Sequence, residues 1–380
     1  MATIRKFMKY SDNVTKVLCV NLESSMAGAE QSLLLLVRFV PKNIQIFTAC
    51  SPGILADRLG SLGIRTYRIL ASPKRFNYFW VWFFYIVIVN LQIFVIAFRT
   101  KPYIIHANGT KALLAAVLAR IFTGSKILWH MRDWKCSRLL AEICEHISSK
   151  IVTVSRSVKN NLVNVGIKAE HIDVVYNGTD SGDIVTEVKE RNENNPIVFA
   201  NIGQFVPWKK QFLFIEAAEK FLQEGLEGKF IMIGDDIFCR DSKYKKKLID
   251  RVETSHFAKH IKILGWRDRL NSFWPKINCL VHTTDVEPFG RVIIEAMAHG
   301  IPIIAVAAGG PSEIIISGKT GLLFNIEGSE ELFNAMKIIA EDRGLAHKLA
   351  INAKQYVLST FEARKTAEDI ARVYEGLIAT

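Results

Sequence analysis

The stretch DVEPFGRVIIEAMAHGIP, residues 285–302, places the carboxylates Glu287 and Glu295 eight residues apart, on either side of a Pro-Phe-Gly corner. It follows INCLVHTT, a short apolar run with β-branched residues, so together they predict a strand, a loop and a helix. Pro288 suits the first turn of a helix, where its missing N–H is not needed. We therefore predict a helix from Pro288 to about Gly300, with Glu287 at its entrance and Glu295 about two turns inside.

The same order of a short apolar run and a longer helical pattern recurs along the chain. In the first half the runs are KVLCVN, IQIFTAC, YIIHAN, KILWHM and KIVTVS, and the helical patterns cover residues 29–40, 53–62, 110–122, 137–147 and 156–165. In the second half the runs are IVFANIG, KFIMIGD, IKILGW and INCLVHTT, with a helix from about residue 209. This alternation predicts an α/β fold with doubly wound, Rossmann-like parallel sheets.

A length of 380 residues is typical of two domains. The polar stretch SGDIVTEVKERNENNP has no periodicity, and it places the boundary at about residues 178–195. We predict a Rossmann-like N-terminal domain over residues 1–180 and a second Rossmann-like domain over 195–360, facing each other across a cleft. Residues 361–380 are predicted to form a helix that packs back on the first domain.

Polar segments follow several of the predicted strands at their carboxyl ends, where open parallel sheets bind ligands. These segments are AGAEQS, HMRD, GQFVPWKK, the opening stretch and the glycine loop AAGGPSE, residues 307–313. Helix N-termini and glycines favour the close approach of anions, and carboxylates accept hydrogen bonds from sugar hydroxyls. The combination suits a nucleotide sugar, although on spacing alone Glu287 fits a solvated helix cap and Glu295 a surface salt bridge equally well.

The segment EPFGRVIIEAMAHGIPIIAVAAGGPSEIIISGKTGLLF resembles the signature of the retaining glycosyltransferases of family 4, which have the GT-B fold. It has their E-x7-E motif and the GGP-x-E segment that follows it. The resemblance covers most of the chain, because AGAEQS, VTVSRSVKNNL, VVYNGTD and IGQFVPWKKQFLFIEAA stand where that family has similar segments. It implies the transfer of a sugar from a UDP- or GDP-sugar donor, with no further cofactor and no metal.

The resemblance also implies roles for individual residues on the donor side. It places Glu287 beside the hydroxyls of the donor sugar, Glu295 on the ribose and Lys209 on the diphosphate. The implied donor-binding residues also include Gly203, Gln204, Lys210, Phe289, Gly290, Gly309, Gly310 and Glu313. The family usually has an arginine where this chain has Gln204. We expect either that Lys210 or Arg132 compensates for the missing cation, or that stabilisation of the leaving group and donor affinity are weaker in this chain.

The remaining implied residues belong to the N-terminal half. His130 matches a family histidine near the donor sugar and is the third expected catalytic residue, beside Glu287 and Lys209. We assign Gly28, His106 and Arg132 to the acceptor side. In the family the leaving phosphate is thought to assist removal of the acceptor proton on the same face, and we assign no protein nucleophile.

Other functions fit the sequence less well. A metal-binding acidic motif at GDD, residues 234–236, or at Asp285 and Glu287 would suit the other glycosyltransferase fold, but that fold has one nucleotide domain. The first loop lacks G-x-G-x-x-G, which disfavours a nicotinamide enzyme. A nucleotide-sugar epimerase of GT-B fold and a catalytically degenerate GT-B scaffold protein stay open as alternatives.

The positive charge of the chain is concentrated in its first half. Residues 1–160 contain 22 Lys and Arg against 7 Asp and Glu, a net charge of +15, whereas the whole chain carries +12. Such an excess attracts a phosphorylated substrate, a nucleic acid or an anionic membrane surface. The sequence has no recognition helix or RNA-binding aromatic signature, so we expect no nucleic-acid partner. Six scattered cysteines without a CxxC pair favour reduced thiols and a cytosolic location.

The stretch FNYFWVWFFYIVIVNLQIFVIAF, residues 76–98, has no charged residue and is flanked by Lys74, Arg75, Arg99 and Lys101. Its length reaches the ~20 residues that span a bilayer. Spanning would put strands of one sheet on opposite sides of the membrane, which the continuous alternation forbids. Burial within the domain and a helix lying in the membrane interface stay open, and the positive charge favours the interface. We therefore predict a cytoplasmic protein that is peripheral or monotopic on the inner face of the membrane, with a lipid-linked, lipopolysaccharide or polysaccharide acceptor.

Overall fold

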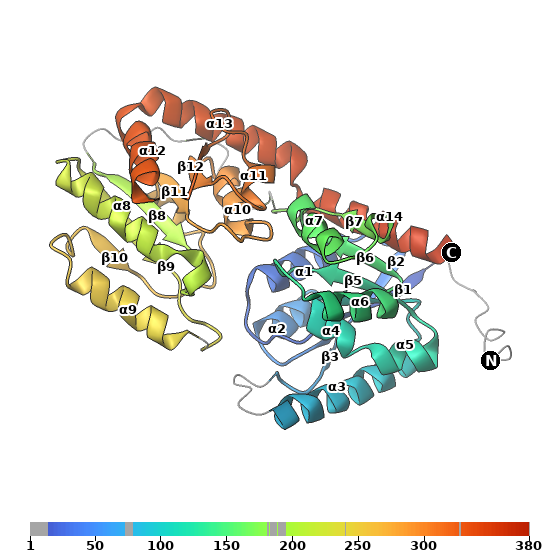
Figure 1. Ribbon diagram of the computed structural model, residues 1–380. Coiled ribbons are helices and arrows are strands. Elements are labelled where there is room, and N and C mark those ends of the chain that lie inside the picture. The colour runs from blue at the N-terminus through green and yellow to red at the C-terminus, as the bar shows by residue number, and fades with distance from the viewer. Residues whose placement is uncertain are drawn as a thin grey trace.

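The computed structural model describes residues 14–72, 79–180, 182, 188, 195–239, 241–326 and 328–379. Two α/β domains lie side by side, the N-terminal one on the right of Figure 1 and the C-terminal one on the left. Most of the predicted boundary, residues 178–195, lies outside the described residues.

The N-terminal domain is built on a seven-stranded parallel sheet with the order β3-β2-β1-β4-β5-β6-β7. Every predicted run of the first half forms one of its strands, whereas β3 and β7 were not predicted. The strands are β1 (Thr15–Asn21), β2 (Ile44–Cys50), β3 (Arg65–Arg68), β4 (Ile104–Asn108), β5 (Lys126–Met131), β6 (Lys150–Thr153) and β7 (Ile172–Val174). The helices are α1 (Gly28–Phe39), α2 (Ile54–Ser61), α3 (Phe79–Thr100), α4 (Thr110–Leu114), α5 (Val117–Thr123), α6 (Arg138–Ile147) and α7 (Arg156–Asn164).

The C-terminal domain has a six-stranded parallel sheet with the order β10-β9-β8-β11-β12-β13. The strands are β8 (Ile197–Ile202), β9 (Gly228–Ile233), β10 (Ile261–Ile263), β11 (Cys279–His282), β12 (Ile303–Val306) and β13 (Leu322–Phe324). The helices are α8 (Gln211–Gln223), α9 (Ser242–Glu253), α10 (Arg291–Ala298), α11 (Pro311–Ile314), α12 (Ser329–Glu341), α13 (Arg343–Thr360) and α14 (Ala363–Ala379). Short 3₁₀ turns cover Ala169–His171, Pro207–Lys209 and Trp274–Lys276. The predicted fold class, two doubly wound parallel sheets, is confirmed.

The central strands are buried on both faces, as strands of a doubly wound sheet must be. In β1 the last five residues are buried, and in β11 all four are. Because strands of this kind carry apolar residues without alternation, the runs were visible in the sequence. The short edge strand β3, Arg65–Arg68, has two exposed and two half-buried residues, so it lacks that signal.

Two elements join the domains. The last helix, α14, leaves the C-terminal domain and packs on α1 of the N-terminal domain, where Ile370 and Tyr374 share a buried apolar cluster with Leu33 (Figure 1). The rings of Tyr176, Phe289 and Phe361 also meet, with centroids 5.6–6.0 Å apart. These contacts hold the two domains together on one side and leave a cleft between them.

Candidate active site

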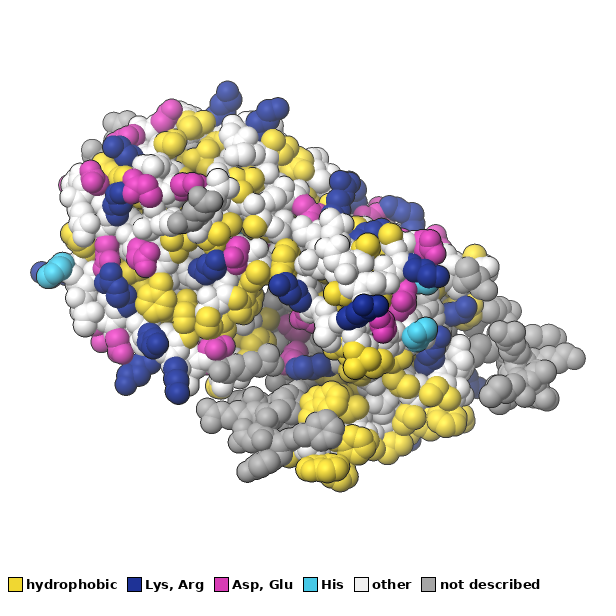
Figure 2. All heavy atoms as spheres, viewed as in Figure 1, with side chains coloured by type: hydrophobic (Ala, Val, Ile, Leu, Met, Phe, Trp, Pro, Cys, Tyr) yellow, Lys and Arg dark blue, Asp and Glu magenta, His cyan; other side chains and the backbone are white. Residues whose placement is uncertain are grey.

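A cleft of about 1010 Å³ lies between the two domains. Its lining residues come from loops at the carboxyl ends of strands in both sheets, and the space-filling view shows the hollow where the two lobes meet (Figure 2). Of the predicted site residues, nine line this cleft: Gly28, Arg132, Gly203, Gln204, Lys209, Glu287, Phe289, Gly290 and Glu295. The fold therefore brings most of the predicted set to one place.

The helix of the E-x7-E motif begins later than predicted. It starts at Arg291, because Gly290 precedes it in a left-handed conformation with φ +102° that residues other than glycine rarely adopt. Pro288 therefore lies in the loop and not in the first turn, and Glu295 lies one turn inside the helix and not two. Glu287 therefore lies in the loop before α10, where its carbonyl oxygen accepts a hydrogen bond from the Gly310 N–H at 2.9 Å.

Glu287 is held by two basic side chains within the C-terminal domain. It forms an ion pair with Lys209 of the loop after β8, and its Oε2 lies 3.2 Å from Nε2 of His282 at the end of β11. Burial by itself would raise the pKa of Glu287, but the Lys209 ammonium and the His282 hydrogen bond outweigh it and hold the pKa well below its usual value. A carboxylate and an ammonium thus face the cleft as a charged pair.

Glu295 is tied to the opposite domain through Arg291. Arg291 donates to Glu295 Oε1 at 2.8 Å, and its other terminal nitrogen donates at 3.0 Å to both the Ser32 hydroxyl and the Gly178 carbonyl. A Cβ atom at Gly28 would lie 3.3 Å from Arg291 Cδ, so the first loop of the N-terminal domain closely approaches this side chain. The start of α10 is therefore a point where the two walls of the cleft touch.

Lys210 does not line the cleft, so its predicted compensation for Gln204 stays a prediction. Its Nζ donates to Asp285 Oδ2 at 2.5 Å, and it is not among the residues that line the cavity. Gln204 lines the cleft, and its carbonyl oxygen accepts a hydrogen bond from the Gln211 side chain at 2.6 Å. The position where the family has an arginine is thus neutral, and Lys209 is the cation of this loop that lines the cleft.

Arg132 lies on the N-terminal wall of the cleft, and its guanidinium group is hydrogen-bonded to neutral side chains. It donates to the side-chain oxygens of Asn108 and Asn177, the latter at 2.9 Å, and lies 3.4 Å from Nδ1 of His130. Burial lowers its pKa to about 10, which leaves it charged at neutral pH. No carboxylate forms an ion pair with Arg132 in the described part of the chain. Arg132 is therefore a half-buried cation that faces the cleft.

Glu30 is a carboxylate on the same wall of the cleft as Arg132. It lies in the first turn of α1, lines the cleft, and accepts a hydrogen bond from the Ala27 N–H at 3.1 Å. Burial raises its pKa to about 7, an effect that the nearby Arg132 opposes. Sequence reasoning missed Glu30, although the AGAEQS segment that contains it was singled out.

His106 and His130 are more deeply placed than predicted. His106 is fully buried, and its Nδ1 lies 2.6 Å from the Tyr374 hydroxyl of α14. Its Nε2 lies 3.1 Å from Nδ1 of His130, which is 2% exposed. His106 does not line the cleft, which corrects its assignment to the acceptor side, because a strand residue pointing into the core has no free surface there. His130 borders a small second cavity beside Ser32 and Arg132, and its Nε2 has no hydrogen-bond partner among the residues that the structure describes.

The GGP-x-E segment does not line the cleft either, so its predicted contact with the donor stays a prediction. Glu313 reaches across to the N-terminal domain, where its carboxylate accepts hydrogen bonds from the backbone N–H groups of Arg156 and Ser157 at 2.8 and 2.7 Å. The hydroxyls of Ser157 and Tyr176 donate to it at 2.6 and 3.0 Å. A carboxylate at the start of α7 is favoured by the free amides there, so Glu313 fastens the two domains together.

The two glycines of that segment allow close packing. A Cβ atom at Gly309, whose φ is +59°, would lie 3.0 Å from the Trp134 ring of the other domain. One at Gly310 would lie 2.3 Å from the Phe289 carbonyl oxygen. Both positions require glycine for steric reasons.

Two further residues were missed by sequence reasoning. His282 ends β11 and was treated as part of a strand, and only the fold shows that it reaches Glu287. Arg291 had a signal in the sequence, because it precedes Glu295 by four residues on one helix, the spacing of an ion pair.

The acidic residues considered for a metal site are engaged by lysines. Asp235 pairs with Lys245 at 2.6 Å, and Asp285 pairs with Lys210. Within the described residues no group of three or more His, Cys, Asp or Glu side chains could hold a metal ion.

Two family models match the chain, one for each domain. The model described as Glycosyltransferase Family 4 matches residues 26–182, and the one described as Glycosyl transferases group 1 matches residues 185–356. Together they cover both walls of the cleft.

The chain is similar to curated proteins and to a solved structure. It is 31% identical to an uncharacterized glycosyltransferase, MJ1178, of Methanocaldococcus jannaschii over 60% of each chain, so it spans less than two thirds of that relative. It is 22% identical to the UDP-Gal:alpha-D-GlcNAc-diphosphoundecaprenol alpha-1,3-galactosyltransferase of Escherichia coli, over 74% of this chain and 77% of that protein. The structure of Anabaena HepE in complex with UDP and glucose superposes with a TM-score of 0.81 and 22% identity, over 95% of this chain and 99% of that one, which shows the same fold.

Proposed function

This chain belongs to the family 4 glycosyltransferases of the GT-B fold, and from that membership we propose that it is a retaining, metal-independent hexosyltransferase. In this proposal it moves a sugar from a nucleoside-diphosphate sugar to a lipid-linked, lipopolysaccharide or polysaccharide acceptor. The observation that carries the proposal is the Lys209–Glu287 pair in the cleft, beside the start of α10.

The C-terminal wall suits the donor. Glu295 is close enough to the cleft to accept hydrogen bonds from the ribose hydroxyls, and the loop Pro288–Gly290 offers backbone groups to the sugar and diphosphate. Lys209 supplies the cation that stabilises the charge developing on the diphosphate as it leaves. Glu287, kept ionised by Lys209 and His282, accepts hydrogen bonds from the hydroxyls of the transferred sugar.

The reaction exchanges one bond at the anomeric carbon for another on the same face. The bond from that carbon to the diphosphate oxygen breaks, and a bond to the acceptor hydroxyl oxygen forms. The acceptor proton goes to an oxygen of the leaving diphosphate. Arg132 is a cation on the N-terminal wall, where we place an acceptor that carries negative charge.

The names of relatives support the acceptor class and the location. The Escherichia coli relative is named for a diphosphoundecaprenol-linked acceptor, and another, LpsE of Rhizobium meliloti, for lipopolysaccharide core biosynthesis. We propose a similar acceptor for this chain and a place on the cytosolic face of an anionic membrane.

Thermal-shift measurements with UDP-, GDP- and ADP-sugars test the donor. A rise in Tm with one class, followed by product formation with lipid-phosphate or oligosaccharide acceptors in excess EDTA, is the expected result. The anomeric configuration of the product, measured by NMR, tests retention.

The controls separate the alternatives. Binding of a nucleotide sugar without any turnover over a panel of acceptors would favour the degenerate scaffold, and release of an epimerised sugar without an acceptor would favour the epimerase. An inverted product, or activity that disappears with EDTA and returns with a divalent cation, would contradict the mechanism.

A further inference from the structure

Helix α3, Phe79–Thr100, packs with one face only. Its residues Tyr85, Val89, Ile93 and Ala97, spaced by four, are buried in the core of the N-terminal domain. Within the described residues, one helix, Trp80–Thr100, is long and apolar enough to span a membrane by length and composition, and a third of that span is buried. The rest of its apolar surface needs another explanation.

The opposite side of α3 carries a continuous apolar stripe. Trp80, Phe84, Leu91 and Phe98 are 51–66% exposed, and their spacings of four and seven residues put them on one side of the helix. From Trp80 to Phe98 the helix rises by about 27 Å. These four side chains expose roughly 500 Å² of apolar surface, about as much as the largest patch of a typical monomer.

Helix α5 extends the stripe. Ile121 and Phe122 at its end are 64% and 63% exposed, and the Phe122 ring lies 5.4 Å from that of Phe94. Hydrophobic side chains gather along the lower edge of the N-terminal domain in Figure 2, where Figure 1 places α3. We call the side chains of Trp80, Phe84, Leu91, Phe98, Ile121 and Phe122 the apolar face.

The geometry excludes a spanning role for α3. Its buried side packs on the sheet, and it connects β3 to β4, which lie in the same sheet on either side of β2 and β1. Both ends of the helix must therefore stay on one side of a bilayer. A helix with one face packed and the other apolar lies parallel to the surface to which it binds.

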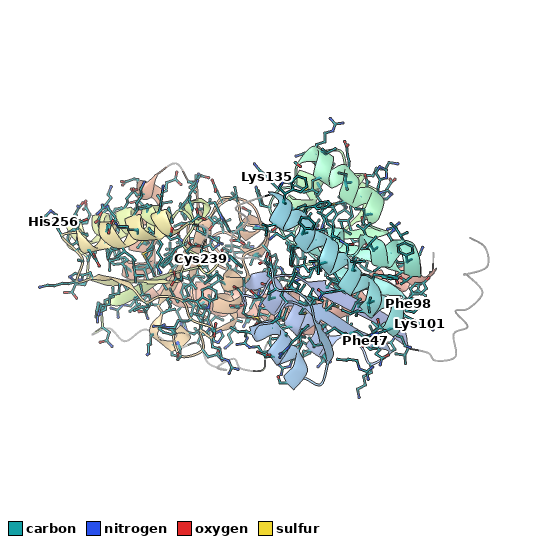
Figure 3. All side chains as sticks on the ribbon, turned by 90° about the horizontal axis from the view of Figure 1, so that it is seen from below. Phe47, Phe98, Lys101, Lys135, Cys239 and His256 are labelled. Atoms are coloured by element: carbon teal, nitrogen blue, oxygen red, sulfur yellow. The ribbon has the colours of Figure 1, made fainter. Side chains whose placement is uncertain are left out.

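The charges of this domain favour a lipid surface over a second copy of the chain. Arg99 and Lys101 are exposed at the end of α3, and Figure 3, seen from below, shows Phe98 and Lys101 next to each other there. The first 160 residues carry a net charge of +15. Two copies meeting through this face would bring two such halves together, whereas an anionic bilayer attracts them.

We propose that the apolar face docks on an anionic bilayer with α3 lying in the headgroup region. Figures 1 and 3 both place the beginning of α3 on the side of the N-terminal domain that faces the C-terminal domain, so docking holds the cleft between the domains close to the membrane surface. The acceptor is then a lipid whose polar head enters the cleft while its chain stays in the bilayer. This assignment of the acceptor rests on the proposed glycosyl transfer, whereas the docking itself does not.

Flotation with liposomes tests the docking. Wild type, Phe84→Glu/Phe98→Glu and the matched control Ile316→Glu/Ile338→Glu, whose side chains are 43% and 45% exposed in the other domain, are compared. The vesicles are pure phosphatidylcholine or a mixture with phosphatidylglycerol, at low and high salt. We expect wild type and control to float, more strongly with phosphatidylglycerol and less at high salt, and the α3 variant to lose at least roughly tenfold in partitioning.

Two further readouts keep the outcomes distinct. Nucleotide affinity by titration calorimetry must be the same in all three proteins, which shows that the α3 variant is folded. Wild type that stays unbound with both vesicles, or an α3 variant that floats as well as wild type, overturns the docking. A dimer that the α3 variant dissociates, without vesicle binding, would assign the face to a second copy instead. Vesicle binding without any glycosyl transfer would support the docking proposal and would overturn only the proposed function.

Discussion

The two walls of the cleft hold their charged groups in different ways. On the C-terminal wall the charges are paired with each other, Lys209 with Glu287 and Arg291 with Glu295. On the N-terminal wall Arg132 is held by two asparagine amides and a histidine, and Glu30 by a backbone N–H. Paired charges keep their protonation states over a wide pH range, whereas charges held by neutral groups respond to burial and to whatever enters the cleft.

This difference predicts that the two walls of the cleft have different functions. A preformed pair is a rigid donor site, because its geometry is set before any ligand arrives. A half-buried cation without a carboxylate in an ion pair, such as Arg132, keeps its attraction for an incoming anion. We therefore expect changes on the C-terminal wall to act on the donor and its chemistry, and changes on the N-terminal wall to act on the acceptor and on pH dependence.

The largest effect is expected for Lys209→Ala. Losing one oriented cation at the leaving group costs about 2 to 4 kcal/mol of transition-state stabilisation, or roughly 30- to 1000-fold in kcat/KM. Steady-state kinetics measure it, with Lys337→Ala as the control, since Lys337 forms only an exposed pair with Glu341 on the same helix. Wild-type turnover in Lys209→Ala would show that the diphosphate lies elsewhere.

Glu30 on the N-terminal wall should make the free energy of unfolding depend on pH. Its pKa in the folded chain is about 7, above its ordinary 4.5. The protonated form is therefore favoured by folding, and that stability is complete below about pH 4.5 and is lost as the pH rises to 7. Glu30→Gln should remove about 1 to 3 kcal/mol of this pH dependence in the free energy of unfolding. Denaturant titrations at pH 5 and pH 8 measure it, and an unchanged difference between them would contradict the expectation.

The two glutamates of the C-terminal wall should separate binding from turnover. Glu295→Ala should weaken the affinity for the free nucleoside diphosphate by roughly tenfold, since it loses a charge-assisted hydrogen bond to the ribose. Glu287→Ala should mainly reduce turnover, because its contact is to the reacting sugar. Isothermal titration with the nucleoside diphosphate distinguishes them, and equal losses of affinity would contradict both assignments.

Arg132→Gln tests the N-terminal wall directly. The substitution keeps hydrogen-bond donors and removes the cation, so KM for an anionic acceptor should rise roughly five- to tenfold while donor affinity stays unchanged. The matched comparison is a neutral oligosaccharide acceptor, for which we expect little change. A loss of donor affinity instead would place the diphosphate against Arg132, which would then replace the cation that Gln204 lacks.

The smallest effect is expected for Gln204→Arg. The family has a cation at this position and Lys210 is occupied by Asp285, so an added arginine should leave kcat/KM within roughly threefold of wild type or raise it. The variant also reports on the geometry of the C-terminal wall. A large loss of activity would mean that Gln204 makes a contact that an arginine cannot replace.

The sequence by itself determined the architecture and most of the donor wall. Apolar runs predicted nine strands, because strands buried on both faces carry no polar alternation, and glycines and glutamates after them marked the carboxyl ends of the sheets. It did not show β3, whose residues Arg65–Arg68 are polar and partly exposed. The start of α10 was also misplaced. Pro288 predicted the first turn there, but Gly290 has a left-handed conformation, so the helix begins after it at Arg291.

Only the tertiary structure decided which predicted residues face the cleft. Glu313 and Lys209 both follow a strand, yet Glu313 caps α7 of the other domain while Lys209 turns toward Glu287. His106 is buried against Tyr374, about 270 residues further along the chain. Contacts of this range depend on how two sheets and a returning helix pack, and local sequence carries no signal for a partner in another domain. The exposed side of α3 also depends on the tertiary structure. The helix is apolar all round, so only its packing on the sheet decides which side is buried and which side can contact a membrane.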